Sequence, residues 1–296
     1  MRITALLALA LMLPGALLAQ EPAAPPPVEV TYLANEGFLI RAGEQAVLID
    51  AFVAEPYSLY RALTPEMRRQ LEAAEGPFAG VDLALTSHHH RDHWQVEPAR
   101  RFLDAAPGCF FASSAQVVGE LGADGWERAG DDGAPPHPVR LAPGETEVLE
   151  RDGLGVELLH LSHGTGRHAK VQNLGHLITI AGRRLLHVGD AAVEEANFAP
   201  YRLAERDLDL AFVPFWYFLS SEGQQLVRRH FAGARLVACH VPDADRDEVA
   251  ALLAKDWPEA VLLRDPGDTL TLPPPDGGDE ATADEQTGTG APVDGR

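Results

Sequence analysis

Short runs of alternating apolar and polar residues open the main body of the chain and predict β-strands. Residues 28–34 (VEVTYLA) and 37–42 (GFLIRA) alternate like two paired strands, and residues 45–52 (QAVLIDAF) continue the same sheet. Residues 81–87 (VDLALTS) are almost wholly apolar, which indicates a buried strand. A further strand is expected at residues 109–113 (CFFAS).

Between these strands the apolar spacing changes to that of helices. Residues 64–76 predict a helix that Thr64 caps at its start and that Gly76 ends. Residues 95–108 predict a second helix, and the polar residues 122–137 predict a long loop.

The second half of the chain is again rich in strands. One helix is expected at residues 220–233. Strands are expected at residues 155–162, 173–182, 183–190, 208–215 and 235–240, with 235–240 as the final strand of the fold. Runs of strands with interspersed helices predict an α/β fold in which mixed sheets form a sandwich.

Side chains that can bind metals recur where the predicted strands end. His88 follows the strand at 81–87, and His163, Asp190 and His240 each end or follow a later strand. Loops at strand ends can bring residues that are distant in sequence together. These positions are therefore the first candidates for a functional site.

The stretch 87–94 (SHHHRDHW) is the densest group of such side chains. Two readings are open: an accidental exposed polar cluster, or a metal site containing His88, His90, Asp92 and His93. Ligands at positions i and i+2 of an extended segment project to the same side. Two metals about 3.5–4 Å apart can share one nucleophilic water.

The pattern HxHxDH, followed by LSHG, LLHVGDA and VACHV, resembles the metallo-β-lactamase superfamily of hydrolases. The opening segments, YLANEGFLI and VLIDAF, look most like the branch that contains ascorbate-6-phosphate lactonase and N-acyl-phosphatidylethanolamine phospholipase D. The resemblance implies a four-layer αββα sandwich over residues 28–272 and a binuclear metal hydrolase.

The resemblance also implies a ligand set. One metal would be held by His88, His90 and His163, the other by Asp92, His93 and His240, and Asp190 would bridge the two. Zn²⁺ is the expected metal, although Mn²⁺ and Fe²⁺ accept the same donors.

The expected reaction is attack by a metal-bridging hydroxide on an ester, lactone or phosphodiester bond of a small molecule, with Asp92 and Asp190 as the catalytic carboxylates. Many zinc β-lactamases have a cysteine or no bridging ligand where this chain has Asp190, which disfavours antibiotic hydrolysis.

Two alternatives stay open. The first is a mononuclear iron oxidoreductase like the persulfide dioxygenases, and the second is a non-catalytic metal-binding protein on the same fold. The complete set of seven ligand candidates argues against both.

The remaining histidines have weaker claims. His89 is expected to face away from the metals, and His160 and His187 lie in apolar strands and are expected to be core residues. His168 competes with His163 for the metal, and we favour His163 because it directly ends a strand.

Other candidates lie in the turns. Asp50 is expected to orient a ligand histidine rather than bind metal. Asn35 and Glu36 are expected to form a simple hairpin turn, with side chains that reach the site as the alternative. Trp216 and Tyr217 either line the substrate pocket or form an aromatic plug at the end of the sheet.

Charge and cysteines narrow the possible partners. The formal net charge is -20, so a nucleic-acid partner is not expected, because such a surface repels phosphate backbones. Cys109 and Cys239 are expected to be buried free thiols, with a disulfide as the alternative. Residues 273–296 have almost no apolar side chains and are expected to be a disordered acidic tail.

The N-terminus indicates export. The apolar run at residues 3–19 is short for a membrane span, which needs about 20 residues. Residues 1–19 are therefore expected to be a signal peptide that is cleaved after Ala19, followed by a Pro-rich spacer at 20–27. The mature protein is expected to be periplasmic or secreted, without stable membrane insertion. An uncleaved anchor is the alternative.

Overall fold

The computed structural model describes residues 24–128, 133–151 and 153–275. The expected signal peptide at 1–19, the first part of the spacer and most of the acidic tail lie outside these residues.

Two mixed sheets form the centre of the described molecule. The first has the strand order β13-β1-β2-β3-β4-β5-β6 and the second has the order β12-β11-β10-β9-β8-β7. The first sheet contains β1 (Val28–Ala34), β2 (Gly37–Ala42), β3 (Gln45–Ile49), β4 (Leu83–Thr86), β5 (Phe110–Ser114), β6 (His137–Val139) and β13 (Thr269–Leu272). The second contains β7 (Thr146–Arg151), β8 (Leu154–His160), β9 (Leu174–Ile180), β10 (Arg183–His187), β11 (Leu210–Pro214) and β12 (Arg235–Cys239).

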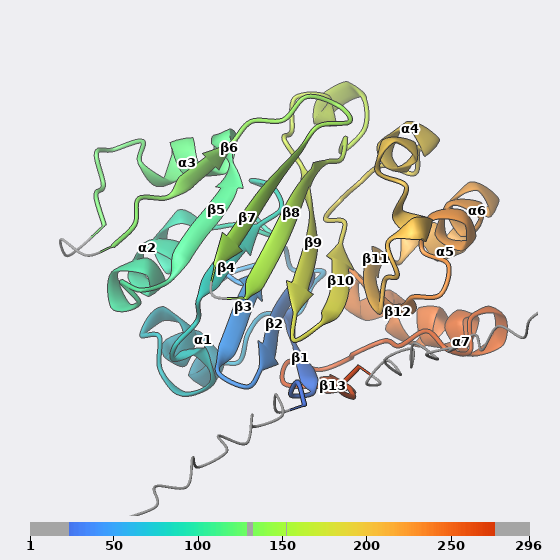
Figure 1. Cartoon of the computed structure of the whole chain (residues 1–296), viewed down its shortest axis with the longest axis horizontal. Coiled ribbons are helices and arrows are strands. Elements are labelled where there is room, and N and C mark those ends of the chain that lie inside the picture. The colour runs from blue at the N-terminus through green and yellow to red at the C-terminus, as the bar shows by residue number, and fades with distance from the viewer. Residues whose placement is uncertain (1–23, 129–132, 152, 276–296) are drawn as a thin grey trace, which may run out of the picture.

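Helices cover the outer face of each sheet. Figure 1 shows α1, α2 and α3 on one side of the two sheets and α4, α5, α6 and α7 on the other. These helices are α1 (Pro65–Glu72), α2 (Val96–Ala105), α3 (Ala115–Leu121), α4 (Glu195–Phe198), α5 (Trp216–Leu219), α6 (Ser221–His230) and α7 (Arg246–Asp256).

The alternation of side chains along each strand explains this layering. Val30 and Ile40 point into the core between the sheets, whereas Leu39 points outward under the first group of helices. Leu159 and Leu186 likewise point outward from the second sheet toward the second group of helices. The arrangement is an αββα sandwich, which confirms the fold class expected from the sequence.

The predicted helix at 64–76 begins as expected but ends early. The Thr64 hydroxyl accepts a hydrogen bond from the Met67 amide at 3.2 Å, which caps α1. The helix stops at Glu72 because Ala74 adopts a left-handed conformation with φ of 50°. Gly76 then begins a short 3₁₀ helix instead of ending α1.

The expectation that residues 235–240 form the last strand is wrong. A further strand, β13, follows α7 and pairs antiparallel with β1, with Val28 opposite Leu272. With only four residues it gives too little alternation to stand out in the sequence. Cys109 and Cys239 are both buried and free, as expected.

The direction of the strands places many strand ends at one edge. In the first sheet β3, β4, β5 and β6 are parallel. In the second, β10, β11 and β12 are parallel, and β8 runs the same way because β8 and β10 are both antiparallel to β9. The two edges meet, since the Ser87 carbonyl accepts from the Leu174 amide at 3.0 Å and the Asn35 carbonyl accepts from the His240 amide at 3.3 Å.

Candidate metal centre

Four side chains from three strand ends form the first group of possible metal ligands. His88, His90, His163 and Asp190 bring one ligand atom each within 4.8 Å of one another. His90 Nδ1 lies 3.0 Å from His88 Nε2 and 3.2 Å from His163 Nε2. Asp190 Oδ2 completes the group at 3.3 Å from His163 Nε2 and 3.7 Å from His88 Nε2.

A second group lies directly beside the first. Asp92, His93 and His240 also bring one ligand atom each within 4.8 Å of one another. His240 Nε2 is 3.1 Å from His93 Nε2 and 3.4 Å from Asp92 Oδ2. All seven residues predicted from the sequence therefore converge on one place, although they come from distant parts of the chain.

The carboxylate of Asp190 stands between the two groups. Its Oδ2 faces His88 and His163, whereas its Oδ1 lies 3.4 Å from His93 Nε2 and 3.3 Å from His240 Nε2. Asp190 is buried, and Oδ1 has no hydrogen-bond partner among the described residues. Such an atom calls for an explanation because buried polar atoms are normally paired.

The spacing of these atoms fits divalent metals. Metal–ligand bonds of 2.0–2.2 Å in a tetrahedron place neighbouring ligand atoms about 3.3–3.6 Å apart. Three of the four distances around Asp190, at 3.3–3.4 Å, and the 3.4 Å between His240 and Asp92 fall in this range. The fourth, 3.7 Å to His88, is slightly longer, and the distances between neighbouring histidines, 3.0–3.2 Å, are slightly shorter. The donor set of imidazoles and carboxylates suits the same ions.

Asp50 controls which nitrogen two of the histidines present. Its carboxylate accepts from His93 Nδ1 at 2.8 Å, from the Ser87 hydroxyl at 2.5 Å and from the Ser87 amide at 2.6 Å. Because the Ser87 hydroxyl donates to Asp50, its oxygen accepts from His88 Nδ1 at 3.0 Å. Both rings therefore carry a proton on Nδ1 and turn Nε2 toward Asp190. Asp50 lies where the sequence placed it, behind a candidate ligand.

Three residues of this region have a left-handed backbone. Asn35, Asp50 and His240 have φ values of 50°, 44° and 59°. Such conformations are uncommon for residues other than glycine and gather at functional sites, where surrounding contacts hold them. In this protein they turn the chain sharply at the ends of β1, β3 and β12.

The expectation that Asn35 and Glu36 form only a hairpin turn is wrong. The Asn35 side-chain amide donates to the Asp92 carbonyl at 3.2 Å and to Asp92 Oδ2 at 3.4 Å. Glu36 is fully buried, and its Oε2 lies 3.9 Å from His93 Nδ1 and 3.7 Å from His187 Nε2. The sequence signal for both was the position of the turn after the first strand, which lies at the same edge as the other strand ends.

Electrostatics divide the site into two kinds of histidine. Burial lowers the pKa of His90 to about 4 and takes the pKa of His88 well below its ordinary value. Burial alone would also lower the pKa of His93, but Asp190, Asp50 and Glu36 outweigh it and raise that pKa to about 9. The Asp190 side of the second group therefore attracts positive charge.

The other histidines lie outside these groups. His163, rather than His168, belongs to the first group, and His168 stacks on it with ring centroids 4.4 Å apart. His89 Nδ1 faces Glu120 Oε1 at 2.8 Å, away from both groups. His187 is buried between the sheets, as expected of a core residue, and its Nε2 donates to the Glu36 carbonyl at 3.1 Å.

The two aromatic candidates point in different directions. Trp216 is half-buried and its ring lies 5.0 Å from the ring of His240. Tyr217 is fully buried, and its hydroxyl donates to the Ala191 carbonyl at 2.9 Å. The structure thus places Tyr217 in the core, which corrects its assignment to a substrate pocket. The ring of Tyr60, which the sequence did not single out, also lies close to the His240 ring, at 4.7 Å.

The fold and these two adjoining histidine–aspartate groups define a metal-dependent hydrolase of the metallo-β-lactamase type. Residues 29–222 match the family described as the Beta-lactamase superfamily domain, and the chain belongs to this family. The likeness to one branch of the superfamily stays a prediction.

Solved structures share the fold at low sequence identity. A possible metal-dependent hydrolase from Veillonella parvula is 16% identical with a TM-score of 0.60, over 84% of this chain and 100% of that one. Igni18, a metallo hydrolase from Ignicoccus hospitalis, is 16% identical with a TM-score of 0.55, over 83% and 98%. YhfI from Bacillus subtilis, a metallo-beta-lactamase fold protein, is 14% identical with a TM-score of 0.55, over 83% and 100%.

Helices that might cross a membrane were sought in the described ranges. None there has both the length and the apolar character that a span requires.

Proposed function

We propose that this chain is an exported binuclear hydrolase that cleaves an ester, lactone or phosphodiester bond in a small molecule. The observation that carries the proposal is the Asp190 carboxylate, which presents one oxygen to each of two ligand groups. A single metal would leave one of these groups, and one buried oxygen of Asp190, without a partner.

The proposed ligand assignment follows the two groups. His88, His90 and His163 would hold one ion, Asp92, His93 and His240 the other, and Asp190 would bind both. Zn²⁺ is our choice because tetrahedral imidazole and carboxylate sites suit it, while Mn²⁺ and Fe²⁺ accept the same donors. When bound, the metals supply a water nucleophile with a pKa of about 7 and positive charge that stabilises an oxyanion.

The chain's own residues would position this chemistry. Asn35 holds the carboxylate of Asp92 through its side-chain amide, so that Asp92 can orient the attacking water. Asp50 and Ser87 hold the rings of His88 and His93 against rotation. Both arrangements exist before a substrate arrives, which lowers the cost of reaching the transition state.

The test combines metal analysis with a substrate panel. Mature protein should contain two metal ions per chain and should hydrolyse a member of the ester, lactone or phosphodiester classes but no β-lactam. One iron per chain with oxidation of a persulfide would replace the proposal with the mononuclear alternative. Two bound metals without hydrolysis of any class would favour a non-catalytic binding protein.

A pair of variants locates the chemistry. We predict that Asp190→Ala lowers kcat/KM by more than about 100-fold, since loss even of an outer partner of a metal ligand costs 10–100-fold. His89→Ala is the matched control, because His89 lies in the same segment but faces Glu120. Equal activity of the two variants would refute the bridging role of Asp190.

Export is proposed from the sequence of residues 1–19. The intact mass of protein recovered from the periplasm or medium should correspond to a chain that begins at Gln20. Recovery of the full-length chain in a membrane fraction would instead support an uncleaved anchor.

A further inference from the structure

Two aromatic side chains from separate loops flank His240. Tyr60 lies on the loop between β3 and α1, and its ring meets the His240 ring edge-on at 4.7 Å and 88°. Trp216 begins α5, just after β11, and meets the same ring at 5.0 Å and 69°. One side of the candidate metal centre is therefore bounded by aromatic rings.

The polar atoms of these two rings are not used by the fold. Neither the Tyr60 hydroxyl nor the Trp216 indole nitrogen has a hydrogen-bond partner in the described part of the chain, and both side chains are half-buried. By contrast, the neighbouring Tyr217 donates to two backbone carbonyls at 2.9 and 3.1 Å. The polar atoms of Tyr60 and Trp216 are therefore free to contact a ligand, whereas that of Tyr217 is not.

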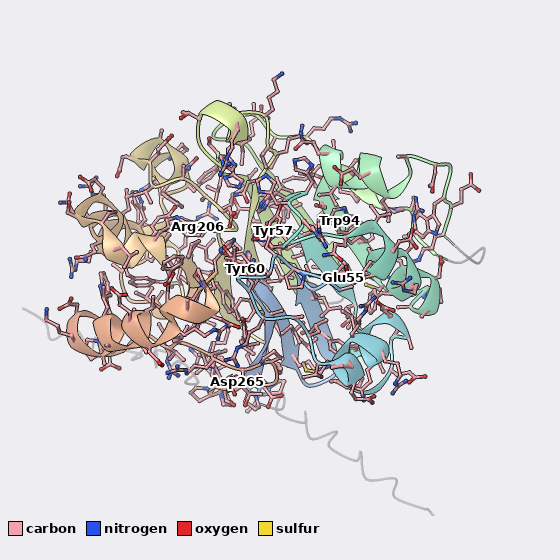
Figure 2. The ribbon with its side chains drawn as sticks, turned by 180° about the vertical axis from the view of Figure 1, so that it is seen from behind. Glu55, Tyr57, Tyr60, Trp94, Arg206 and Asp265 are labelled. Atoms are coloured by element: carbon pink, nitrogen blue, oxygen red, sulfur yellow. The ribbon has the colours of Figure 1, made fainter. Side chains whose placement is uncertain are left out.

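Apolar surface continues outward along the same two segments. The large apolar side chains that are exposed in the described ranges are Tyr57, Leu59, Val148 and Leu219. All but Val148 lie within three residues of Tyr60 or Trp216 in sequence. Figure 2 shows Tyr57 and Tyr60 close together near the centre of the view. Isolated exposed apolar residues are ordinary, but three of them on the two segments that carry Tyr60 and Trp216 favour an apolar binding surface there.

Specific contacts hold the loop of Tyr60 in place. The Leu59 carbonyl accepts from the Asp243 amide at 2.9 Å, just beyond His240 in the chain. Arg61 pairs with the Asp243 carboxylate at 2.9 Å and also with Asp265. The position of Tyr60 next to His240 is therefore built by the fold.

Charge limits which chemical groups can bind against Tyr60 and Trp216. Asp92 and Asp190 form no ion pair with lysine or arginine in the described part of the chain, and the protein carries a net charge of -20. The cation next to Tyr60 in the chain, Arg61, is already paired with Asp243 and Asp265, so a phosphate or carboxylate placed against Tyr60 and Trp216 would have to compete with two carboxylates for it. An apolar group would gain from burial against both rings.

We infer that Tyr60 and Trp216 form the wall of a subsite for an apolar acyl or aromatic group next to the bond that is cleaved. The inference rests on the proposed function and narrows its substrate class to uncharged carboxylic esters and lactones with an apolar acyl part. Hydrolysis adds the oxygen of water to the acyl carbon, breaks the acyl carbon–oxygen bond and yields a carboxylate, a hydroxyl group and one proton.

The test measures preference for chain length in the metal-loaded mature protein. The probes are p-nitrophenyl acetate, butyrate and octanoate, with bis-p-nitrophenyl phosphate as the phosphodiester. Wild-type kcat/KM should rise with acyl length. Tyr60→Ala and Trp216→Ala should each reduce the ratio of octanoate to acetate by about tenfold, mainly through KM, as expected for lost apolar contact. Tyr60→Phe should keep the preference because it keeps the ring.

The control is Trp126→Ala, which removes a half-buried indole that packs on Arg100 away from the site. It should leave the ratio unchanged, and metal content should stay at the wild-type level in all variants. Ester hydrolysis with an unchanged length preference in both alanine variants would overturn the inference alone. Hydrolysis of the phosphodiester but of no ester would also overturn it while leaving the proposed function intact. Absence of all hydrolysis with two metals bound would overturn both.

Discussion

Asp50 is the residue on which both ligand groups depend. It holds His93 directly and His88 through Ser87, yet it is not one of the seven predicted ligands. Although burial alone would raise its pKa, the hydrogen bonds with His93 and Ser87 keep the pKa of Asp50 below its ordinary value. It is therefore an ionised acceptor, which is what fixes the protons on both rings.

We predict that Asp50→Asn lowers metal affinity by about 10–100-fold, the usual cost of losing an outer partner of a ligand. An amide has one acceptor oxygen and cannot serve three donors. Competition with a chromophoric chelator measures the affinity. The matched control is Asp82→Asn, since Asp82 also accepts from a backbone amide, that of Ala46, at 2.8 Å but lies away from the site. Equal affinities in the two variants would contradict the role of Asp50.

The raised pKa of His93 gives a second prediction at this scale. In the metal-free protein its pKa is about 9, so at pH 7 the ring carries a second proton and a positive charge. Metal binding requires the neutral ring. Metal uptake at pH 7 should therefore release at least one proton and should become tighter as pH rises toward 9. Calorimetry in two buffers of different ionisation enthalpy measures the proton count. A count of zero at pH 7 would refute the prediction.

Sequence reasoning selected these seven candidate ligands because they lie at or just after the ends of recognisable strands. Asp50 was placed behind a ligand by its residue type and its position after a strand. Tyr60 was missed because its loop has no periodic pattern, and its approach to His240 depends on contacts with Asp243 far along the chain. The sequence could not tell which of Trp216 and Tyr217 faces the site. Adjacent residues of a helix differ by about 100° in direction, so the answer depends on how the helix is rotated in the folded chain.

At the scale of elements, the turn after β10 is tightly constrained. Gly189 has φ of 55°, and a Cβ atom there would lie 2.7 Å from Ser87 Cβ and would also clash with Asn173 Oδ1. Asn173 in turn accepts from the Asp190 amide at 3.1 Å and donates to the Val188 carbonyl at 3.1 Å. This turn is therefore packed tightly enough to set the position of the Asp190 carboxylate.

We predict that Gly189→Ala destabilises the fold by about 3 kcal/mol or more and reduces metal content, because strain and a steric clash act together. Gly80→Ala is the control: its φ of 65° is also left-handed, but nothing lies within 4 Å of the added atom. It should cost only about 1–2 kcal/mol and should leave metal content unchanged. Urea denaturation and metal analysis distinguish the two, and similar values for both would contradict the argument.

Elements with clear patterns were predicted well, and edge elements were not. The sequence analysis did not identify the helices α3, α4, α5 and α7 or the strands β6, β7 and β13. β6 and β13 have three and four residues, which is too short for alternation to be read. Their positions follow from pairing with longer neighbours, which is a property of the folded chain rather than of the segment.

For the whole molecule, the charges of the site affect the stability of the fold. Four buried carboxylates, Glu36, Asp50, Asp92 and Asp190, lie close together at the strand ends. Burial and the nearby Asp190 raise the pKa of Glu36 to about 8. The metal-free fold therefore carries an electrostatic strain that divalent cations would relieve.

We predict that the Tm of the metal-free, chelated protein is about 10 °C lower than that of protein at a free metal concentration near 1,000 times Kd, since metal binding then contributes about 4 kcal/mol.

The metal-free protein should also lose stability between pH 7 and 9. Because the pKa of His93 is raised from 6.5 to about 9, its protonation stabilises the fold fully below pH 6.5, and this stabilisation is lost as pH rises through 9. Because the pKa of Glu36 is raised from 4.5 to about 8, ionising this buried side chain destabilises the fold increasingly above pH 4.5, and the loss is complete beyond pH 8. Thermal denaturation with and without EDTA tests both, and a metal-free Tm that rises over this range would contradict the second.

The pairing of β1 with β13 has a practical consequence for immobilising the protein. Val28 begins the first strand and Leu272 ends the last one directly opposite, whereas the site lies beyond the other end of β1. Seven residues of strand separate these ends by about 20 Å. A linker, an affinity handle or a solid support joined directly before Val28 or directly after Leu272 would therefore attach on the side away from His240, and an immobilised molecule would keep Tyr60 and Trp216 turned toward the solution.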